Sequence, residues 1–134
     1  MKKLLSICFA AMLLLSSCSG GSSVKIDHSS PEGIVKSYLE ASNKGDADRM
    51  VECLDLSNFD EDRIHTVRTK AEAVAAKDKG KYNSISIGDY NEYNDWVDYE
   101  YKDAEGHDVS GSLQAVSVEG KWYVTVHSTG LLYN

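Results

Sequence analysis

Cysteine is scarce in this sequence, which contains three in 134 residues: Cys8, Cys18 and Cys53. Cys8 lies in an apolar N-terminal run, and Cys18 lies in the short polar segment that follows it. If Cys18 is covalently modified, no intramolecular disulfide is available and the core must be held together by packing. Cys53 lies among apolar residues such as Met50 and Leu54, which predicts a buried and unreactive thiol.

The spacings that define common cofactor and metal sites are also missing. The chain has no glycine-rich phosphate loop and no set of cysteines and histidines at ligand spacing. The acidic stretch Asp103–Asp108 superficially resembles a calcium loop, but the EF-hand pattern is absent. The histidines have no partner at triad spacing and are expected at the surface: His28, His65, His107 and His127. We therefore expect no cofactor, no metal and no catalytic residues.

Positive charge is in the minority. The chain has 14 Lys and Arg against 21 Asp and Glu, and loss of Lys2 and Lys3 with an export signal would change the net charge from −7 to −9. The excess is larger in residues 81–134, which contain three basic and nine acidic side chains. An acidic surface repels phosphate groups, so nucleic acid is excluded as a partner and anionic lipid is a poor one.

The N-terminal apolar run is too short to span a bilayer. Leu4–Leu15 has twelve residues, interrupted only by Ser6, whereas a membrane-spanning helix needs about twenty. With Lys2 and Lys3 before it, the run has the composition of an export signal. Removal of residues 1–17 would leave 117 residues, enough for one domain with a core and too few for two.

The segment Leu15-Ser16-Ser17-Cys18 resembles the lipobox of bacterial lipoproteins. In that family the cysteine thiol receives a diacylglycerol and a peptidase cuts before it, so the resemblance implies that Cys18 carries acyl chains such as palmitate and anchors the protein in a membrane. A plain secretory signal with a chance cysteine is the alternative. Ser19, rather than Asp, after the cysteine implies the outer membrane, with the domain facing the periplasm. Residues 18–29, rich in Ser and Gly, are expected to form a flexible tether.

Three helices are predicted before residue 80. Ser30 and Pro31 form a helix start, and Gly45 can end that helix in the left-handed conformation. A second, shorter helix follows the cap at Asp46 and runs through Leu54. A third is expected over residues 60–79, with apolar residues at helical spacing.

After residue 80 the apolar residues alternate, which predicts strands. Turns at Asp103–Gly106 and Glu119–Gly120 divide the segment, and a change in the parity of the apolar positions predicts a bulge near Ala115. We expect a single α+β domain over residues 30–134, with three N-terminal helices packed on a curved four-stranded antiparallel sheet that curls over the third helix.

Residues 31–46 (PEGIVKSYLEASNKGD) and the turn Gly120-Lys121-Trp122 resemble the opening helix and the closing hairpin of a family of small bacterial lipoproteins. Their domain is nuclear transport factor 2-like, or cystatin-like, and the resemblance covers nearly all of residues 30–134. It implies a cone-shaped pocket between sheet and helix. Most members have no known function, although enzymes of similar fold, such as isomerases and dehydratases, place an Asp or His inside the cone.

Strand parity identifies candidate pocket residues. Tyr99 and Tyr101 share the inner face, with Trp122 nearby, and such side chains can line a pocket for a small amphipathic ligand. They can equally fill the core of a small sheet. Asp95 and Asp103 share the phase of the two tyrosines and are the candidate inward carboxylates, with solvated strand ends as the alternative.

We therefore expect a lipid-anchored cell-envelope module that holds a small amphipathic ligand or a protein partner without catalytic activity. The alternative is a small cone-pocket enzyme, isomerase- or dehydratase-like, with Asp95 as general base and Tyr99 or Tyr101 as hydrogen-bond donors. A third hypothesis is a purely structural accessory subunit.

Overall fold

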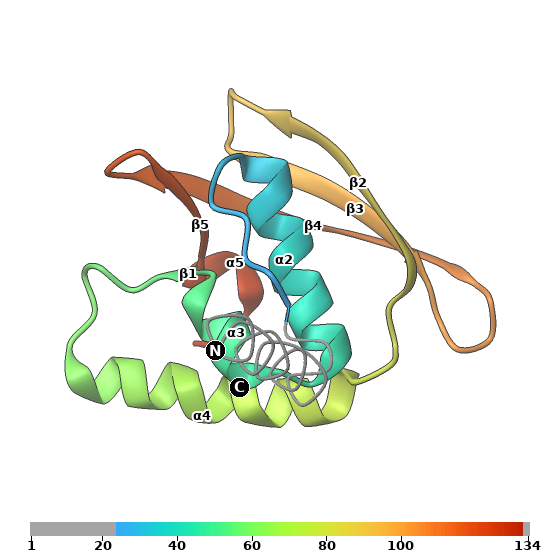
Figure 1. The fold of residues 1–134 in the computed structure, drawn as a ribbon, viewed down its shortest axis with the longest axis horizontal. Coiled ribbons are helices and arrows are strands. Elements are labelled where there is room, and N and C mark those ends of the chain that lie inside the picture. The colour runs from blue at the N-terminus through green and yellow to red at the C-terminus, as the bar shows by residue number, and fades with distance from the viewer. Residues whose placement is uncertain (1–23, 133–134) are drawn as a thin grey trace, which may run out of the picture.

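The structure is a computed structural model that describes residues 24–132 (Figure 1). The helices are α2 (Pro31–Lys44), α3 (Ala47–Glu52), α4 (Glu61–Asp78) and α5 (Val126–Thr129). The strands are β1 (Leu54–Asp55), β2 (Asn83–Asn91), β3 (Trp96–Lys102), β4 (Asp108–Val118) and β5 (Lys121–Thr125). The expected export signal, Cys18 and the tether up to residue 23 lie outside the described residues.

The three N-terminal helices predicted from the sequence are present, and a fourth helix, α5, which the sequence did not predict, follows β5. The first two helices begin at the expected caps. The Ser30 hydroxyl accepts a hydrogen bond from the Gly33 N–H at 2.9 Å at the start of α2, and Gly45 ends that helix with a φ of 70°. The Asp46 carboxylate caps α3 in the same way. The second helix ends at Glu52 rather than at Leu54, because Leu54 begins a strand.

The sheet has five strands in the order β1-β5-β4-β3-β2, not the four that the sequence predicted. Strands β2 to β5 form the expected antiparallel meander. The additional strand, β1, pairs with β5 in parallel, and the Val124 N–H donates to the Cys53 carbonyl at 2.7 Å. The sheet is therefore mixed. A two-residue strand is too short to produce an alternating pattern, so sequence periodicity could not predict it.

The predicted bulge near Ala115 is wrong. Strand β4 passes without a register shift from its pairing with β3 to its pairing with β5, and both Leu113 and Ala115 are buried. Val116 instead faces the other side of the sheet, opposite Tyr123. The register shifts occur in β2, between Asn83 and Ser86 and between Ile87 and Tyr90.

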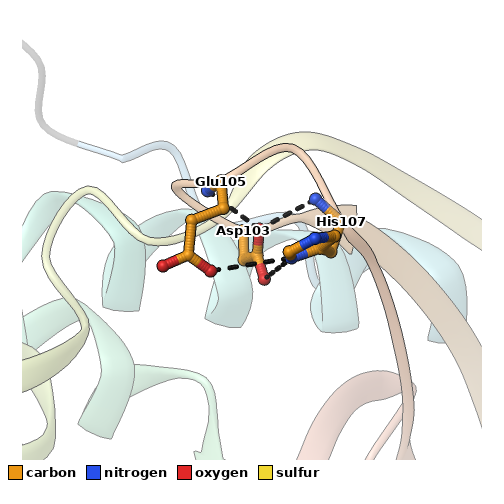
Figure 2. A group of neighbouring side chains, drawn as sticks. All are labelled: Asp103, Glu105 and His107. Atoms are coloured by element: carbon orange, nitrogen blue, oxygen red, sulfur yellow. Dashed lines mark hydrogen bonds and ion pairs between the residues drawn. The ribbon is translucent and has the colours of Figure 1, made fainter.

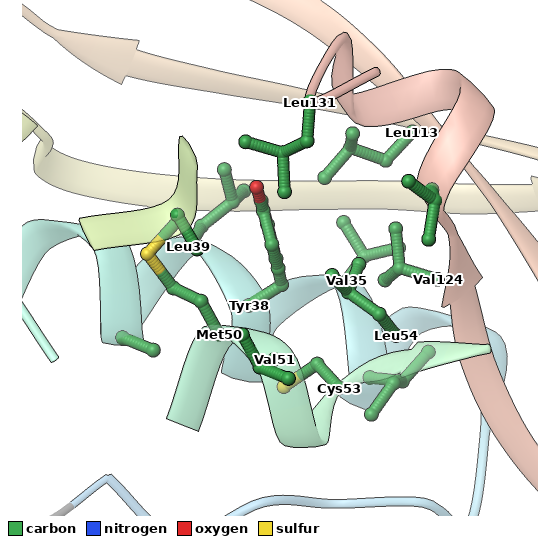
Figure 3. Packing of buried hydrophobic residues seen from close by; sticks show 14 of the residues in the cluster. Val35, Tyr38, Leu39, Met50, Val51, Cys53, Leu54, Leu113, Val124 and Leu131 are labelled. Atoms are coloured by element: carbon green, nitrogen blue, oxygen red, sulfur yellow. The ribbon is translucent and has the colours of Figure 1, made fainter. Parts of the chain in front are cut away.

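Helix α2, not the longer α4, covers the sheet, so the expectation that the sheet curls over the third helix is also wrong. Helix α2 contacts β2, β3, β4 and β5, whereas α4 packs on α2 and α3 (Figure 1). The reason lies in the buried residues. Helix α2 buries large side chains that meet the sheet residues Leu113 and Val124 (Figure 3), whereas α4 buries only Val67, Ala71 and Ala75.

Residues 24–29, which the sequence assigned to the flexible tether, lie against the domain. Val24 is buried, and the Asp27 N–H donates to the Ser37 hydroxyl of α2 at 2.9 Å. The Trp122 N–H of β5 donates to the His28 carbonyl, also at 2.9 Å. This segment therefore connects α2 with β5 through hydrogen bonds. Across residues 24–132, no helix has both the length and the apolar character needed to cross a bilayer.

Candidate functional site

The four residues predicted to bind a ligand divide between two ends of the sheet. Asp95 and Trp122 belong to one cluster, and Tyr99 and Tyr101 belong to another. Asp95 lies in the turn that precedes β3, whereas Tyr101 lies near the far end of that strand, five residues after Trp96, which corresponds to about 17 Å. Asp95 and Tyr101 therefore lie too far apart to act together on one small ligand, and Tyr99 stacks on Tyr101 in the second cluster.

Tyr90 is the centre of the first cluster. Its hydroxyl donates to Asp95 Oδ1 at 2.5 Å, and its ring meets the Trp122 ring edge to face with 5.3 Å between centroids. Its N–H donates to the Glu32 carboxylate of α2 at 3.1 Å. The hydrogen bond to Asp95 raises the pKa of Tyr90 to about 12. The phenol therefore stays protonated and continues to donate its hydrogen bond to the Asp95 carboxylate. The alternation of apolar residues along β2 does not predict that Tyr90 faces inward, because it is the register shift in β2 that turns Tyr90 onto the inner face.

Tyrosines also form the second cluster. The Tyr101 ring lies 4.5 Å from the Tyr82 ring and 6.2 Å from the Tyr99 ring, measured between centroids. The Tyr82 hydroxyl donates to Asp78 Oδ2 at 3.1 Å, which ties the start of β2 to the end of α4. Burial raises the pKa of both Tyr82 and Tyr99. These rings pack against one another, as the core-filling alternative requires.

Between the two clusters the helix-covered face is apolar. Tyr38, Leu39 and Met50 are among the fully or nearly fully buried side chains (Figure 3). No carboxylate, imidazole, lysine or arginine of residues 24–132 is buried. Cys53 is buried, as predicted, and desolvation raises the pKa of its thiol to about 12. Among the described residues, this face therefore holds no fully buried carboxylate or imidazole that could act as a general base.

A groove occupies the opposite side of the sheet, which we call the exposed face. Its volume is about 420 Å³, and small or acidic side chains of β2, β3 and β4 dominate its lining. The lining residues are Ser86, Gly88, Asp98, Tyr99, Glu100, Ser110, Gly111 and Ser112. Strand register explains their gathering, because Glu100 of β3 pairs with Ser86 on one side and Ser110 on the other. The small side chains leave the space between the carboxylates open.

A second hollow of about 580 Å³ lies beside the β2–β3 turn. It is lined by Asp89, Tyr90, Asn91, Glu92, Tyr93 and Asp98. Asp98 lines both hollows, and we call the two together the acidic groove. Four carboxylates line it, whereas none of its described lining residues is lysine, arginine or histidine. Sequence reasoning missed this surface because alternating serines and acids on a strand also describe an ordinary solvated face.

The β3–β4 turn contains a cluster of Asp103, Glu105 and His107 (Figure 2). Asp103 Oδ1 accepts hydrogen bonds from the backbone N–H groups of Glu105 and His107, and the bond from His107 does most to hold the pKa of Asp103 below its usual value. His107 Nδ1 lies 3.3 Å from Asp103 Oδ2 and 3.6 Å from Glu105 Oε2. Of the described side chains, these three have ligand atoms close enough together to hold a cation. The same contacts also account for the shape of the turn.

No family model and no curated protein matches the sequence. Among solved structures, the chain is similar to the crystal structure of a Campylobacter jejuni protein provisionally named an NTF2-like transpeptidase. The superposition has a TM-score of 0.62 and 20% sequence identity, and covers 73% of this chain and 99% of that chain. Identity at this level shows a common fold and nothing of activity. The described domain therefore has a nuclear transport factor 2-like fold, as the sequence resemblance implied.

Proposed function

We propose that this protein is a lipid-anchored module of the bacterial cell envelope that binds a partner through the exposed face of its sheet and has no catalytic activity. The contrast between the two faces of the sheet carries the proposal. The helix-covered face is apolar and free of buried carboxylates and imidazoles within residues 24–132, whereas the exposed face contains the acidic groove. The acidic groove, where we propose that a partner binds, thus lies outside the space between the helices and the sheet.

The absence of catalysis is supported by the geometry around Asp95. A general base needs a partly desolvated position and a free oxygen within reach of substrate. Asp95 accepts the Tyr90 hydroxyl hydrogen bond at 2.5 Å, and the donors expected to assist it, Tyr99 and Tyr101, belong to the other cluster. This separation of Asp95 from the two tyrosines within residues 24–132 favours the binding module over the cone-pocket enzyme.

The proposed anchor suits a partner site on the exposed face. Residues 25–27 run along α2, since the Ser37 hydroxyl contacts both the Lys25 carbonyl and the Asp27 N–H. A lipid on Cys18 would thus attach from the helix layer, and the acidic groove lies on the other side of the sheet. The groove would then point away from the attachment point and stay accessible.

Site-specific cross-linking tests the proposal. A photoreactive amino acid replaces Ser110 in the acidic groove of the full-length protein, in the cells that make it, and the control position is Ala76 on the exposed side of α4. We expect a discrete cross-linked product from position 110 and none from position 76. Products from position 76 with none from position 110 would place the binding surface on the helices and refute the proposal.

A further inference from the structure

The carboxylates of the acidic groove form no close ion pair with a basic side chain within the described chain, although the charge of Glu100 contributes, after the hydrogen bond to Asp108, to raising the pKa of Lys102. Ion pairs within residues 24–132 involve none of Asp89, Glu92, Asp98 and Glu100. The basic residue that follows them on β3, Lys102, is paired with Asp108 at 2.7 Å. Asp98 accepts a hydrogen bond from the Ser112 hydroxyl, which orients the carboxylate without neutralising its charge. The groove therefore presents negative charge to an incoming partner.

Tyr93 adds an aromatic ring to this negative surface. Its side chain is 93% exposed and is the one large apolar side chain of residues 24–132 with that degree of exposure. The turn that presents it is well fixed, because the Tyr93 N–H donates to the Asn91 side chain at 3.0 Å and the Asp95 N–H donates to the Asn91 carbonyl at 2.8 Å. An aromatic face beside carboxylates attracts cations through both its quadrupole and the neighbouring charges.

The spacing of the carboxylates suits an extended chain. Asp98 and Glu100 are two residues apart on one strand and point to the same face, so their side chains lie about 7 Å from each other. Alternate side chains of an extended peptide have the same spacing. Ser86 and Ser110 lie on either side of Glu100 and can hydrogen-bond the peptide groups of such a segment.

We infer that the acidic groove receives an extended basic segment of a protein partner, with lysine or arginine side chains facing Asp98 and Glu100 and one of them stacked on Tyr93. This inference rests on the proposed function, because it names the class of partner for the same surface. A second copy of this chain is a poor occupant, since two acidic faces brought together repel each other.

A direct binding experiment tests the inference on the full chain in discs of uncharged lipid. The probe is a fluorescent peptide of about ten residues in which lysine alternates with serine, matching the strand repeat, and the control peptide has glutamine in place of lysine. Fluorescence anisotropy follows binding at about 0.05 M and about 0.5 M salt, where screening differs strongly. We expect the lysine peptide alone to bind, and to bind more weakly at the higher salt.

Matched variants separate a local site from the general acidity of the protein. The pair Asp98→Asn and Glu100→Gln is expected to weaken binding roughly three- to tenfold. The pair Glu61→Gln and Glu72→Gln, which removes the same charge from exposed positions of α4, should change binding by less than about twofold. Tyr93→Ala should weaken binding roughly two- to fivefold, and Tyr93→Phe should not, because it keeps the ring.

Three outcomes would overturn the inference. The first is no binding of the lysine peptide at low salt, and the second is equal weakening by both charge pairs, which would indicate attraction to net charge alone. The third is a dimer that becomes tighter when Asp98 and Glu100 are neutralised, since the groove would then bind a second copy. If the cross-link from position 110 persists while the peptide fails to bind, the proposed function stands and only the basic partner is refuted.

Discussion

The side chain of Tyr99 lies across Gly111 on the neighbouring strand, so closely that a Cβ atom added to Gly111 would stand 2.5 Å from the Tyr99 hydroxyl oxygen. Glycine leaves a gap in the surface of a strand, and an aromatic ring from the opposite residue can cover it. The Tyr99 ring also stacks on Tyr101 at the inner face. The absence of a side chain at position 111 therefore fixes the arrangement of the tyrosine cluster.

Replacement of Gly111 by alanine should destabilise the protein. The added methyl group must push the Tyr99 ring away, and overpacking of this kind costs about 1–3 kcal/mol in the free energy of unfolding. Urea denaturation followed by circular dichroism measures the change. Ser110→Ala, one position away on the exposed face, is the control and should alter stability by no more than about 0.5 kcal/mol. Equal stability of Gly111→Ala and wild type would show that the ring can move without loss.

Two buried serines of α2 should respond in opposite ways to replacement by alanine. Ser42 is 1% exposed, and its hydroxyl has no hydrogen-bond partner among the described residues. The Ser37 hydroxyl accepts from the Asp27 N–H and donates to the Gly33 carbonyl, both at 2.9 Å. Because an unpaired buried hydroxyl costs about 1–3 kcal/mol, Ser42→Ala should leave stability unchanged or increase it, and Ser37→Ala should decrease it by about 1 kcal/mol. Thermal unfolding of both variants checks this, and a lower melting temperature for Ser42→Ala would contradict it.

The helices were predictable because their ends carry local signals. Ser30 and Asp46 cap helices through bonds to backbone groups three residues away, so a short sequence window contains all the information required. Strand β1 has no such signal, since it consists of two residues whose pairing with β5 spans about seventy positions. Coverage of the sheet by α2 rather than α4 likewise depends on which helix presents the larger side chains to a distant surface.

The candidate site was less predictable than the fold, for a similar reason. Parity along β3 correctly placed Tyr99 and Tyr101 on the inner face, but it could not show that Asp95 would bond to Tyr90. That contact requires the register shift between Ile87 and Tyr90, which nothing in the local composition specifies. The acidic groove is a property of three neighbouring strands, so it emerges only when their register is known.

Stability should fall as the pH rises above about 10, and Asp95 should contribute to that fall. In the folded state the pKa of Tyr90 is about 12, whereas an unfolded tyrosine has a pKa of about 10. The folded state thus retains a proton that the unfolded state releases, so this contribution is complete below pH 10 and is lost between pH 10 and 12. In the Asp95→Asn variant the pKa of Tyr90 should move down toward 10. In an ultraviolet titration, the tyrosinate absorbance of this residue should then appear at lower pH than in the wild type. An unchanged titration curve would show that Asp95 does not control this phenol.

Cys53 should be inert to thiol reagents in the folded protein. Burial raises the pKa of its thiol to about 12, so almost no thiolate exists at neutral pH, and the sulfur is not accessible. A colorimetric thiol reagent should therefore detect no reaction in native conditions and a full reaction in denaturant. Cys53→Ala provides the baseline for this measurement. Rapid reaction of Cys53 in the native protein would contradict the buried position and require local opening around α3.

Lipidation of Cys18 predicts both a thiol count and a cellular location. If Cys18 carries a diacylglycerol and Cys8 leaves with the export signal, the mature protein has one titratable thiol in denaturant, that of Cys53. The protein should label with radioactive palmitate and sediment with membranes, because two or three acyl chains hold a protein stably on a bilayer. Cys18→Ala should abolish both the label and the membrane association, whereas Cys53→Ala should affect neither. Two thiols in the denatured protein, without a palmitate label, would show that residues 1–17 serve as a plain secretory signal.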